Sequence, residues 1–254
     1  MSARMKLVVA YLGTPFAGWQ RQQDQPTVQG EIERALAQVT GGRAGAVVGA
    51  GRTDAGVHAA GQVAHCDLPE RLPPAALVRA LNAVLPPAIR IRAAARVDPD
   101  FHARSSARGK LYTFRASWRE PLLPWLGLRV ATVAPVDVDA LGAALRILPG
   151  TRDWASFTVP EPGPDSTVRT LFRVDLRRRR EGFEADFVGD GFLRYQVRRM
   201  MGAALEVAGG LRSPEDLRSL TAEPRPGAAI RTAAAGGLSL ERVYYRSRAV
   251  SRDP

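Results

Sequence analysis

Cysteine, histidine and long apolar runs are all scarce in this 254-residue sequence. Cys66 is the only cysteine, so an intramolecular disulfide is excluded, and its alternating apolar neighbours predict a buried, small hydrophobic side chain. The three histidines are scattered and have no cysteine partners, so no metal-ligand spacing is present, and no nucleotide-binding loop is found. We therefore expect no metal and no other cofactor.

Membrane and export signals are lacking as well. No segment reaches the roughly 20 consecutive apolar residues that a membrane span requires. Residues 1–6 lead directly into a strand-like segment, without the apolar stretch of a secretory signal. A single cysteine also suits a reducing compartment. We expect a cytoplasmic protein without a membrane partner.

Acidic side chains are in the minority. The sequence has 36 Lys and Arg residues against 25 Asp and Glu, a formal net charge of +11, and arginine supplies nearly all of the positive charge. Such an excess favours a polyanionic partner, most commonly nucleic acid. Arginine is also better suited than lysine to phosphate forks and to base stacking. A general compositional bias would give the same excess, so the charge favours nucleic acid without establishing it.

Hydrophobic periodicity organises the first hundred residues into alternating strands and helices. The pattern predicts strands over 6–12, 45–50, 61–68 and 89–97, and helices over 28–39 and 75–85. Thr27 is placed to cap the first helix, and Gly41 and Gly42 are placed to end it. The resulting order, β-α-β-β-α-β, is the ferredoxin-like arrangement, which RNA-recognition modules and many unrelated proteins use.

The second half repeats this pattern loosely. We predict strands over 109–118, 171–177, 183–187 and 238–244, helices over 137–148, 193–208 and 214–220, a hairpin turn over 178–182 and a short extended segment over 154–157. Residues 160–164 and 222–227 are rich in proline and are predicted as loops. The arginine run at 177–180 is interpreted as a solvated strand edge. We place the domains at 1–105 and 106–254, with a groove between two sheet-bearing halves.

One segment combines glycines with a cation and a carboxylate. Residues 49–58 read G-A-G-R-T-D-A-G-V-H and lie between two predicted strands. The three glycines allow a tight backbone that a ligand can approach. By itself the segment also fits an ordinary surface turn. It is not a phosphate-binding glycine loop, since Asp54 in its middle would repel phosphate and no Lys-Ser/Thr pair ends it.

The whole string resembles the catalytic signature of the tRNA pseudouridine synthase A (TruA) family. That family carries a G-R-T-D-x-G-V-H loop, and residues 51–58 match it completely. Other family motifs follow in order along the chain: G-W-Q-x-Q at 18–22, N-x-x-L-P at 82–86, F-H-A-R at 101–104, K-x-Y-x-F/Y at 110–114, D-F-x-S-F at 153–157, F-L-x-x-M-V-R-x-x-x-G at 192–202 and G-L at 237–238. Departures are Gln196 in place of Met, Trp154 in place of Phe, and a loose match over 166–170.

The resemblance implies an α+β pseudouridine synthase fold, in which two ferredoxin-like halves share a central mixed β-sheet with a groove between them. It also implies an isomerase that converts uridine to pseudouridine in the anticodon stem-loop of tRNA, around positions 38 to 40. The family uses an Asp nucleophile, no cofactor and a homodimeric assembly.

The resemblance assigns the catalytic roles residue by residue. Asp54 is the nucleophile, and Arg198 reaches it to favour the charged carboxylate, because burial alone would favour the neutral acid. Tyr112 packs against the target uracil. Arg52 contacts RNA and helps hold the target nucleotide out of its stack. Leu238 closes the apolar side of the pocket.

The remaining RNA contacts are expected from positive or polar side chains on loops and strand ends. The candidates are Trp19, Gln20, Arg21, Arg104 and Arg169. Two other functions stay open: a related pseudouridine synthase with a different RNA target, and a non-catalytic RNA-binding module. An acid in a phosphate-lined groove argues against the second, because it weakens RNA binding. The sequence also leaves open whether Asp54 attacks the sugar, attacks the base or assists glycal formation.

Overall fold

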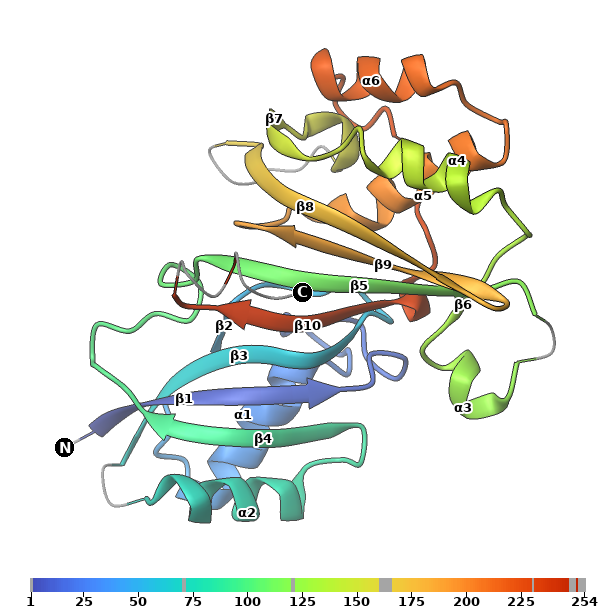
Figure 1. Ribbon diagram of the computed structural model, residues 1–254. Coiled ribbons are helices and arrows are strands. Elements are labelled where there is room, and N and C mark those ends of the chain that lie inside the picture. The colour runs from blue at the N-terminus through green and yellow to red at the C-terminus, as the bar shows by residue number, and fades with distance from the viewer. Residues whose placement is uncertain are drawn as a thin grey trace. The chain divides into compact units, whose positions relative to one another are not determined.

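The computed structural model describes residues 2–69, 72–119, 122–159, 166–229, 231–246 and 250, and the chain forms two compact units (Figure 1). Unit 1 comprises Met1–Arg108 and Leu240–Pro254, and unit 2 comprises Gly109–Ser239. The chain thus returns to unit 1 after Ser239, a step that the division into 1–105 and 106–254 does not include. Within the described ranges, no helix is long and apolar enough to cross a membrane.

Unit 1 contains the ferredoxin-like order predicted for the first hundred residues. Its elements are β1 (Ser2–Tyr11), α1 (Val28–Thr40), β2 (Val48–Gly49), β3 (His58–Pro69), α2 (Pro74–Val84), β4 (Ile89–Arg96) and most of β10 (Leu238–Tyr244). Strand β1 lies between β4 and β3, antiparallel to both, and β2 and β10 both pair with β3 (Figure 1). The predicted order of elements in the first half is confirmed.

Local sequence explains the helices and the core of unit 1. The Thr27 side chain accepts a hydrogen bond from the backbone N–H of Gly30, and α1 ends at Gly41 in the left-handed conformation, as predicted. Buried apolar residues of α1 recur at helical spacing, and α1 packs against α2, which packs against β4. Alternate residues of β1 are buried, and each fully buried side chain of this size contributes about 1.5–3 kcal/mol.

Strand β2 is shorter than the predicted strand over 45–50. Only Val48 and Gly49 pair with β3, opposite His65 and Ala64. A Cβ at Gly49 would lie 2.6 Å from the Trp19 ring, so this position needs glycine for the close approach of the indole. Further along β3, a Cβ at Gly61 would lie 2.3 Å from the carbonyl oxygen of Glu241. The short β2 therefore leaves an edge of β3 for β10, whose bounds agree with the predicted strand over 238–244.

Unit 2 is a mixed sheet with a layer of helices. Its elements are β5 (Gly109–Ser117), α3 (Pro124–Gly127), β6 (Ala131–Thr132), α4 (Val138–Leu145), β7 (Gly150–Asp153), η1 (Ala155–Phe157), β8 (Val168–Arg179), β9 (Gly182–Gly189), α5 (Gln196–Ala208), α6 (Pro214–Ala222) and η2 (Ala235–Gly237). The strand order is β5-β9-β8-β7, antiparallel, with β6 parallel to β5. Helices α4 and α6 both pack against α5. The mixed helix and strand content confirms the predicted α+β class.

Several predicted boundaries in unit 2 are wrong. The helix over 193–208 begins only at Gln196, because Tyr195 has a positive φ of 61°, which interrupts helical geometry. The segment expected to be extended at 154–157 contains the 3-10 helix η1. The hairpin turn is limited to residues 180–181, and α3, β6 and β7 were not predicted. The predicted loop over 160–164 lies outside the described residues.

Two smaller predictions are confirmed. Cys66 is buried, and burial raises the pKa of its thiol to about 12. The arginine run at the end of β8 lies at an exposed edge, where its members pair with carboxylates: Arg177 with Asp186 and Glu184, Arg178 with Asp139, and Arg179 with Glu184. Arg178, Arg179 and Arg180 are exposed, as a solvated edge requires, whereas Arg177 is half-buried and pairs with the buried Asp186.

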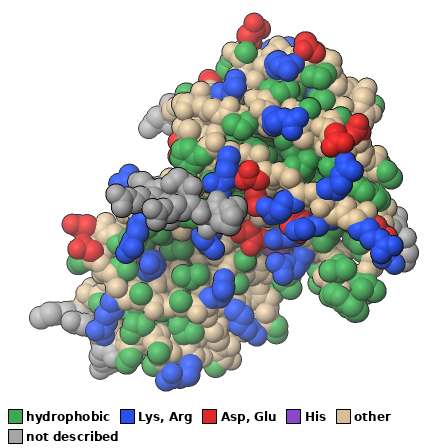
Figure 2. Space-filling model, in the orientation of Figure 1, with side chains coloured by type: hydrophobic (Ala, Val, Ile, Leu, Met, Phe, Trp, Pro, Cys, Tyr) green, Lys and Arg blue, Asp and Glu red, His purple; other side chains and the backbone are tan. Residues whose placement is uncertain are grey.

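The exposed hydrophobic residues include one compact group. Figure 2 shows a green cluster over α3, where Leu123, Trp125, Leu126 and Leu128 are all exposed, Trp125 at 66%. Scattered exposed apolar residues are normal, but four in one short segment are not. The sequence did not predict this cluster, because a short run of proline and leucine does not specify a helix.

Candidate active site

The loop that carries Asp54 connects β2 to β3 in unit 1, and its centre is held from two sides. The backbone N–H of Trp19 donates to the carbonyl oxygen of Thr53 at 3.1 Å. The Thr53 hydroxyl shares a 2.8 Å hydrogen bond with the Tyr11 hydroxyl at the end of β1. Both side chains are buried. The residue directly before Asp54 is therefore fixed through its backbone and its side chain.

Further hydrogen bonds hold both ends of the loop. The side-chain amide of Gln62 donates to the carbonyl oxygen of Gly51 at 2.9 Å, and the N–H of Val57 donates to the carbonyl oxygen of Asp54 at 3.1 Å. At the start of β3, Nδ1 of His58 accepts from the N–H of Gly13 at 3.0 Å, which ties the loop to the end of β1. Rigid support of this kind is what a catalytic side chain needs.

Gly18 is another position where only glycine fits. Its φ is +103°, and an added Cβ would lie 2.8 Å from the carbonyl oxygen of Thr53. The G-W-Q-x-Q segment and the Asp54 loop are thus packed backbone to backbone.

Trp19 is only 2% exposed, and its ring lies 6.0 Å from that of Tyr11. A side chain this buried offers RNA no surface, so the expected RNA contact gives way to a packing role beneath the loop. Gln20 and Arg21 are exposed beside it. Arg21 lies 3.3 Å from Glu33, and its backbone N–H donates to the side chain of Gln29.

The Asp54 loop buries some of its residues and presents others. Thr53 and Val57 are buried, whereas Arg52 is exposed and Asp54 is half-buried. Burial raises the pKa of the Tyr11 hydroxyl, so the partner of Thr53 stays protonated and uncharged. The arrangement presents a carboxylate and a guanidinium on a loop that is firmly held.

Arg104 lies on a second ordered loop of unit 1. The N–H of Ala103 donates to Nδ1 of His65 at 3.1 Å, and the Tyr245 hydroxyl donates to the carbonyl oxygen of Ala103 at 2.8 Å. Burial lowers the pKa of His65, which keeps this ring a neutral acceptor. Arg104 itself is exposed. The supporting roles of His65 and Tyr245 escaped sequence reasoning, because both act on a loop far away in sequence.

The other two candidate catalytic residues belong to unit 2. Tyr112 on β5 is 6% exposed and meets Phe192 edge to face, with ring centroids 5.2 Å apart. Arg198 on α5 donates from Nε to the carbonyl oxygen of Ala233 at 2.8 Å, and its guanidinium lies 5.4 Å from the centre of the Tyr195 ring. Both side chains are held in place within unit 2.

Two further expected residues of unit 2 lie near strand ends. Arg169 is half-buried on β8 and donates to the carbonyl oxygens of Ser166 and Val168. Leu238 is buried at the first position of β10. Over the part of the chain that the structure describes, no group of three or more His, Cys, Asp or Glu side chains could hold a metal ion.

Comparison with known proteins gives a consistent result over nearly the whole chain. The family model described as tRNA pseudouridine synthase matches residues 7–104 and 144–246. Proteins named tRNA pseudouridine synthase A are similar: one from Syntrophotalea carbinolica is 42% identical over 95% of this chain and 96% of its own, and one from Geobacillus kaustophilus is 40% identical over 96% and 95%. A third, from Frankia casuarinae, is 43% identical over 95% of this chain and 89% of its own.

The chain belongs to the tRNA pseudouridine synthase family. The predicted family and the predicted pseudouridine synthase fold class are therefore confirmed. A solved structure of an unknown protein from Galdieria sulphuraria is 11% identical over 83% of this chain and 93% of its own, with a TM-score of 0.24, which is too low to indicate a common fold.

Proposed function

We propose that this protein isomerises uridine to pseudouridine in tRNA, with the carboxylate of Asp54 as the nucleophile. The observation that carries the proposal is the Asp54 loop, in which the buried Thr53 is fixed by Tyr11 and Trp19 while Asp54 and Arg52 stay accessible. The reaction breaks the bond between the sugar and a ring nitrogen, turns the base, and rejoins it through a ring carbon; that carbon loses its proton, and the freed nitrogen gains one. Since no electrons are gained or lost, one well-placed carboxylate can serve it without a redox partner.

The roles of the surrounding residues follow from their chemistry. Arg52 is exposed next to the nucleophile and suits a contact with the RNA backbone beside the extruded nucleotide. By resemblance to the family, the ring of Tyr112 lies against the target base and Leu238 forms an apolar wall; at 6% and 4% exposed, each presents only a small surface for this contact. The guanidinium of Arg198 favours the ionised form of Asp54. Gln20, Arg21, Arg104 and Arg169 contribute to positioning the tRNA.

The substrate position and the assembly belong to the same proposal. By resemblance to the family, the target uridines lie in the anticodon stem-loop, around positions 38 to 40, and the protein is a cytoplasmic homodimer. Mapping pseudouridine in tRNA from cells with and without this protein tests the position. A change only outside the anticodon stem-loop would indicate a pseudouridine synthase with another target.

Asp54→Asn tests the nucleophile directly. The amide is nearly isosteric with the carboxylate but cannot attack, so turnover should be abolished while the fold and tRNA binding are kept. The matched control is Asp100→Asn, which makes the same charge change at an exposed residue of unit 1. Turnover of Asp54→Asn within tenfold of wild type would disprove the assignment, and loss of turnover in both variants would point to a general charge effect.

Arg198→Ala tests the proposed partner of the nucleophile. Arg194 is the matched control, because its guanidinium lies over the same Tyr195 ring, 5.0 Å from the centre. We expect Arg198→Ala to lower turnover far more than Arg194→Ala and to move the Asp54 ionisation in the pH profile to higher pH, because the cation that favours the charged acid is lost. Equal, small losses of turnover in the two variants would indicate that Arg198 and Arg194 are both ordinary charges facing the RNA.

A further inference from the structure

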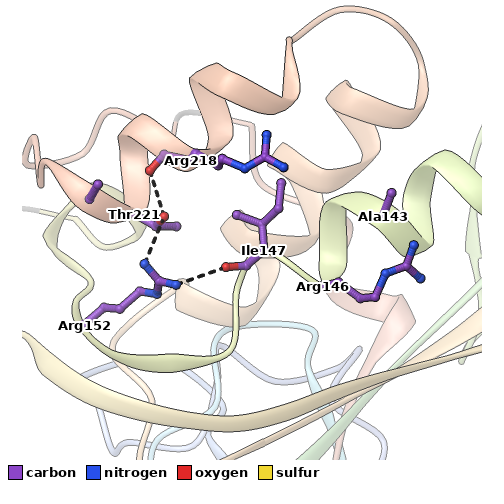
Figure 3. A pocket seen from close by; sticks show the side chains of 7 residues that line it. Ala143, Arg146, Ile147, Arg152, Arg218 and Thr221 are labelled. Atoms are coloured by element: carbon purple, nitrogen blue, oxygen red, sulfur yellow. Dashed lines mark hydrogen bonds between the residues drawn. The ribbon is translucent and has the colours of Figure 1, made fainter.

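A cavity of about 590 Å³ in unit 2 is lined by three arginines (Figure 3). Arg146 follows the end of α4, Arg152 lies on β7, and Arg218 lies on α6. Thr221 and the apolar side chains of Ala143 and Ile147 complete much of the wall. All of these residues belong to unit 2, whereas the Asp54 loop belongs to unit 1, so the cavity and the loop share no residue.

The residues that line the cavity carry three positive charges and no negative charge. None of the lining residues is a carboxylate. Arg218 pairs with Glu215 at 2.7 Å, but both side chains are well exposed, at 58% and 77%, so water screens this pair and it is worth at most about 1 kcal/mol. Arg146 is exposed at the rim and, within the described ranges, forms no ion pair. A negatively charged ligand would meet the exposed guanidinium of Arg146 and would compete with Glu215 for that of Arg218.

Arg152 forms the fixed wall of the cavity. Its guanidinium contacts the Thr221 hydroxyl at 3.5 Å and the carbonyl oxygens of Ile147 and Pro149 at 3.4 Å, all at the long limit of hydrogen bonding. Its buried Nε has no hydrogen-bond partner among the described residues. The guanidinium thus lies near the carboxyl end of α4, where the helix dipole favours a cation, with several donors weakly used. Guanidinium forks of this kind match the oxygens of a phosphate.

The uncharged part of the lining indicates which part of a nucleotide would bind. It contains no aromatic ring on which a base could stack and no side-chain amide that could read a base edge. Recognition would rest on charge, because the buried Thr221 hydroxyl already donates to the carbonyl oxygen of Arg218 at 2.8 Å and is contacted by Arg152. These are features of a site for the phosphate group, which positions a nucleic acid without reading its sequence.

We propose that this cavity docks a backbone phosphate of the tRNA substrate and so supplies a second RNA contact, from unit 2, apart from the Asp54 loop. The inference rests on the proposed activity toward tRNA. It predicts that the exposed arginines of the cavity contribute to tRNA affinity and not to the chemical step.

The test is the double variant Arg146→Ala/Arg218→Ala. Arg152 stays in place because it contacts carbonyl oxygens at the end of α4. The matched control is Arg129→Ala/Arg180→Ala, which removes the same two positive charges from exposed positions of unit 2 outside the cavity. Thermal melting verifies that both proteins are folded. tRNA binding is measured by fluorescence anisotropy across a salt series, and pseudouridine formation is measured at saturating tRNA.

We expect the cavity variant to bind tRNA about tenfold more weakly, with the slope of log affinity against log salt reduced by about 1 to 2, and to keep wild-type turnover at saturation. The control should lose less than threefold. Equal losses in both double variants would overturn the proposal, because they would reflect net charge alone.

A second arm separates backbone phosphate from free nucleotide. Adenosine monophosphate and inorganic phosphate are titrated against the wild type and the cavity variant. Nucleotide binding that disappears in the cavity variant, while tRNA affinity equals that of the control, would overturn the assignment to RNA. A wild-type protein that binds tRNA through the cavity but forms no pseudouridine would instead refute the proposed function and leave the docking site standing.

Discussion

Tyr11→Phe is the perturbation that most directly examines how the Asp54 loop is held. The substitution removes one hydroxyl and keeps the ring that packs near Trp19, so no cavity forms. What is lost is the 2.8 Å hydrogen bond to Thr53, a distance typical of a good O–H···O contact, together with the hydrogen bond between the Tyr11 hydroxyl and the side chain of Gln62. Because Tyr11 and Thr53 are 4% and 6% exposed, water cannot readily replace the missing partner.

The expected cost follows from the burial of both groups. A hydrogen bond between neutral groups contributes about 0.5–1.5 kcal/mol net, and a buried hydroxyl left without its partner costs about 1–3 kcal/mol. We therefore expect Tyr11→Phe to lower the free energy of unfolding by about 1–3 kcal/mol. Turnover should fall as well, since Thr53 directly precedes the proposed nucleophile and a loosened loop places Asp54 less accurately.

A double-mutant cycle with Thr53→Val provides the assay. Each single variant leaves one hydroxyl without its partner, whereas the double variant removes both, so its cost should be smaller than the sum by about 1 kcal/mol or more. Unfolding is followed by denaturant titration, and turnover is followed on tRNA. Strictly additive costs, or a Tyr11→Phe protein with wild-type stability and turnover, would refute the view that this hydrogen bond fixes the loop.

Four other outcomes are expected. Gly18→Ala should destabilise the protein by more than about 2 kcal/mol and lower turnover in activity assays, because φ is +103° and the new Cβ would lie 2.8 Å from the Thr53 carbonyl oxygen; an unchanged melting temperature would contradict this. Burial raises the pKa of Cys66 to about 12, so the stability that its protonated thiol contributes is complete below the ordinary thiol pKa near 9 and is lost as pH rises through about 12. Between about pH 8 and 11, wild type should therefore lose more free energy of unfolding than Cys66→Ala. Equal losses in the two proteins would argue against this. With a net charge of +11, log affinity for tRNA should fall linearly with log salt, and a flat response would exclude a phosphate-tracking surface. Turnover should survive chelation by EDTA, provided that control measurements show the tRNA to be still folded. Inactivation that a divalent ion reverses, with the tRNA folded throughout, would contradict a metal-free reaction.

Much of the fold of unit 1 could be predicted from the sequence because its signals are local. Thr27 caps α1 with its own side chain, and the buried residues of α1 recur at helical spacing. Unit 2 was harder because its boundaries depend on single backbone conformations. Tyrosine has no preference for a positive φ, so the conformation of Tyr195 could not be predicted from its residue type. Because of this conformation, α5 begins only at Gln196. The two-residue strand β6 is too short for any alternation to show.

The candidate site likewise contains residues that the sequence identified and residues that only the structure revealed. Asp54 was identified by the resemblance of residues 51–58 to the family, whereas the residues that hold its loop come from separate segments and are linked by contacts that no local pattern encodes. Trp19 illustrates the consequence, since an aromatic residue in a polar loop suggests a base-stacking contact but its indole is 2% exposed and lies against Gly49. A substitution at Trp19 should therefore lower both stability and turnover, whereas a substitution at the exposed Gln20 should leave stability unchanged. If Trp19→Ala were instead fully stable and defective only in tRNA binding, the packing role assigned to the indole would be wrong.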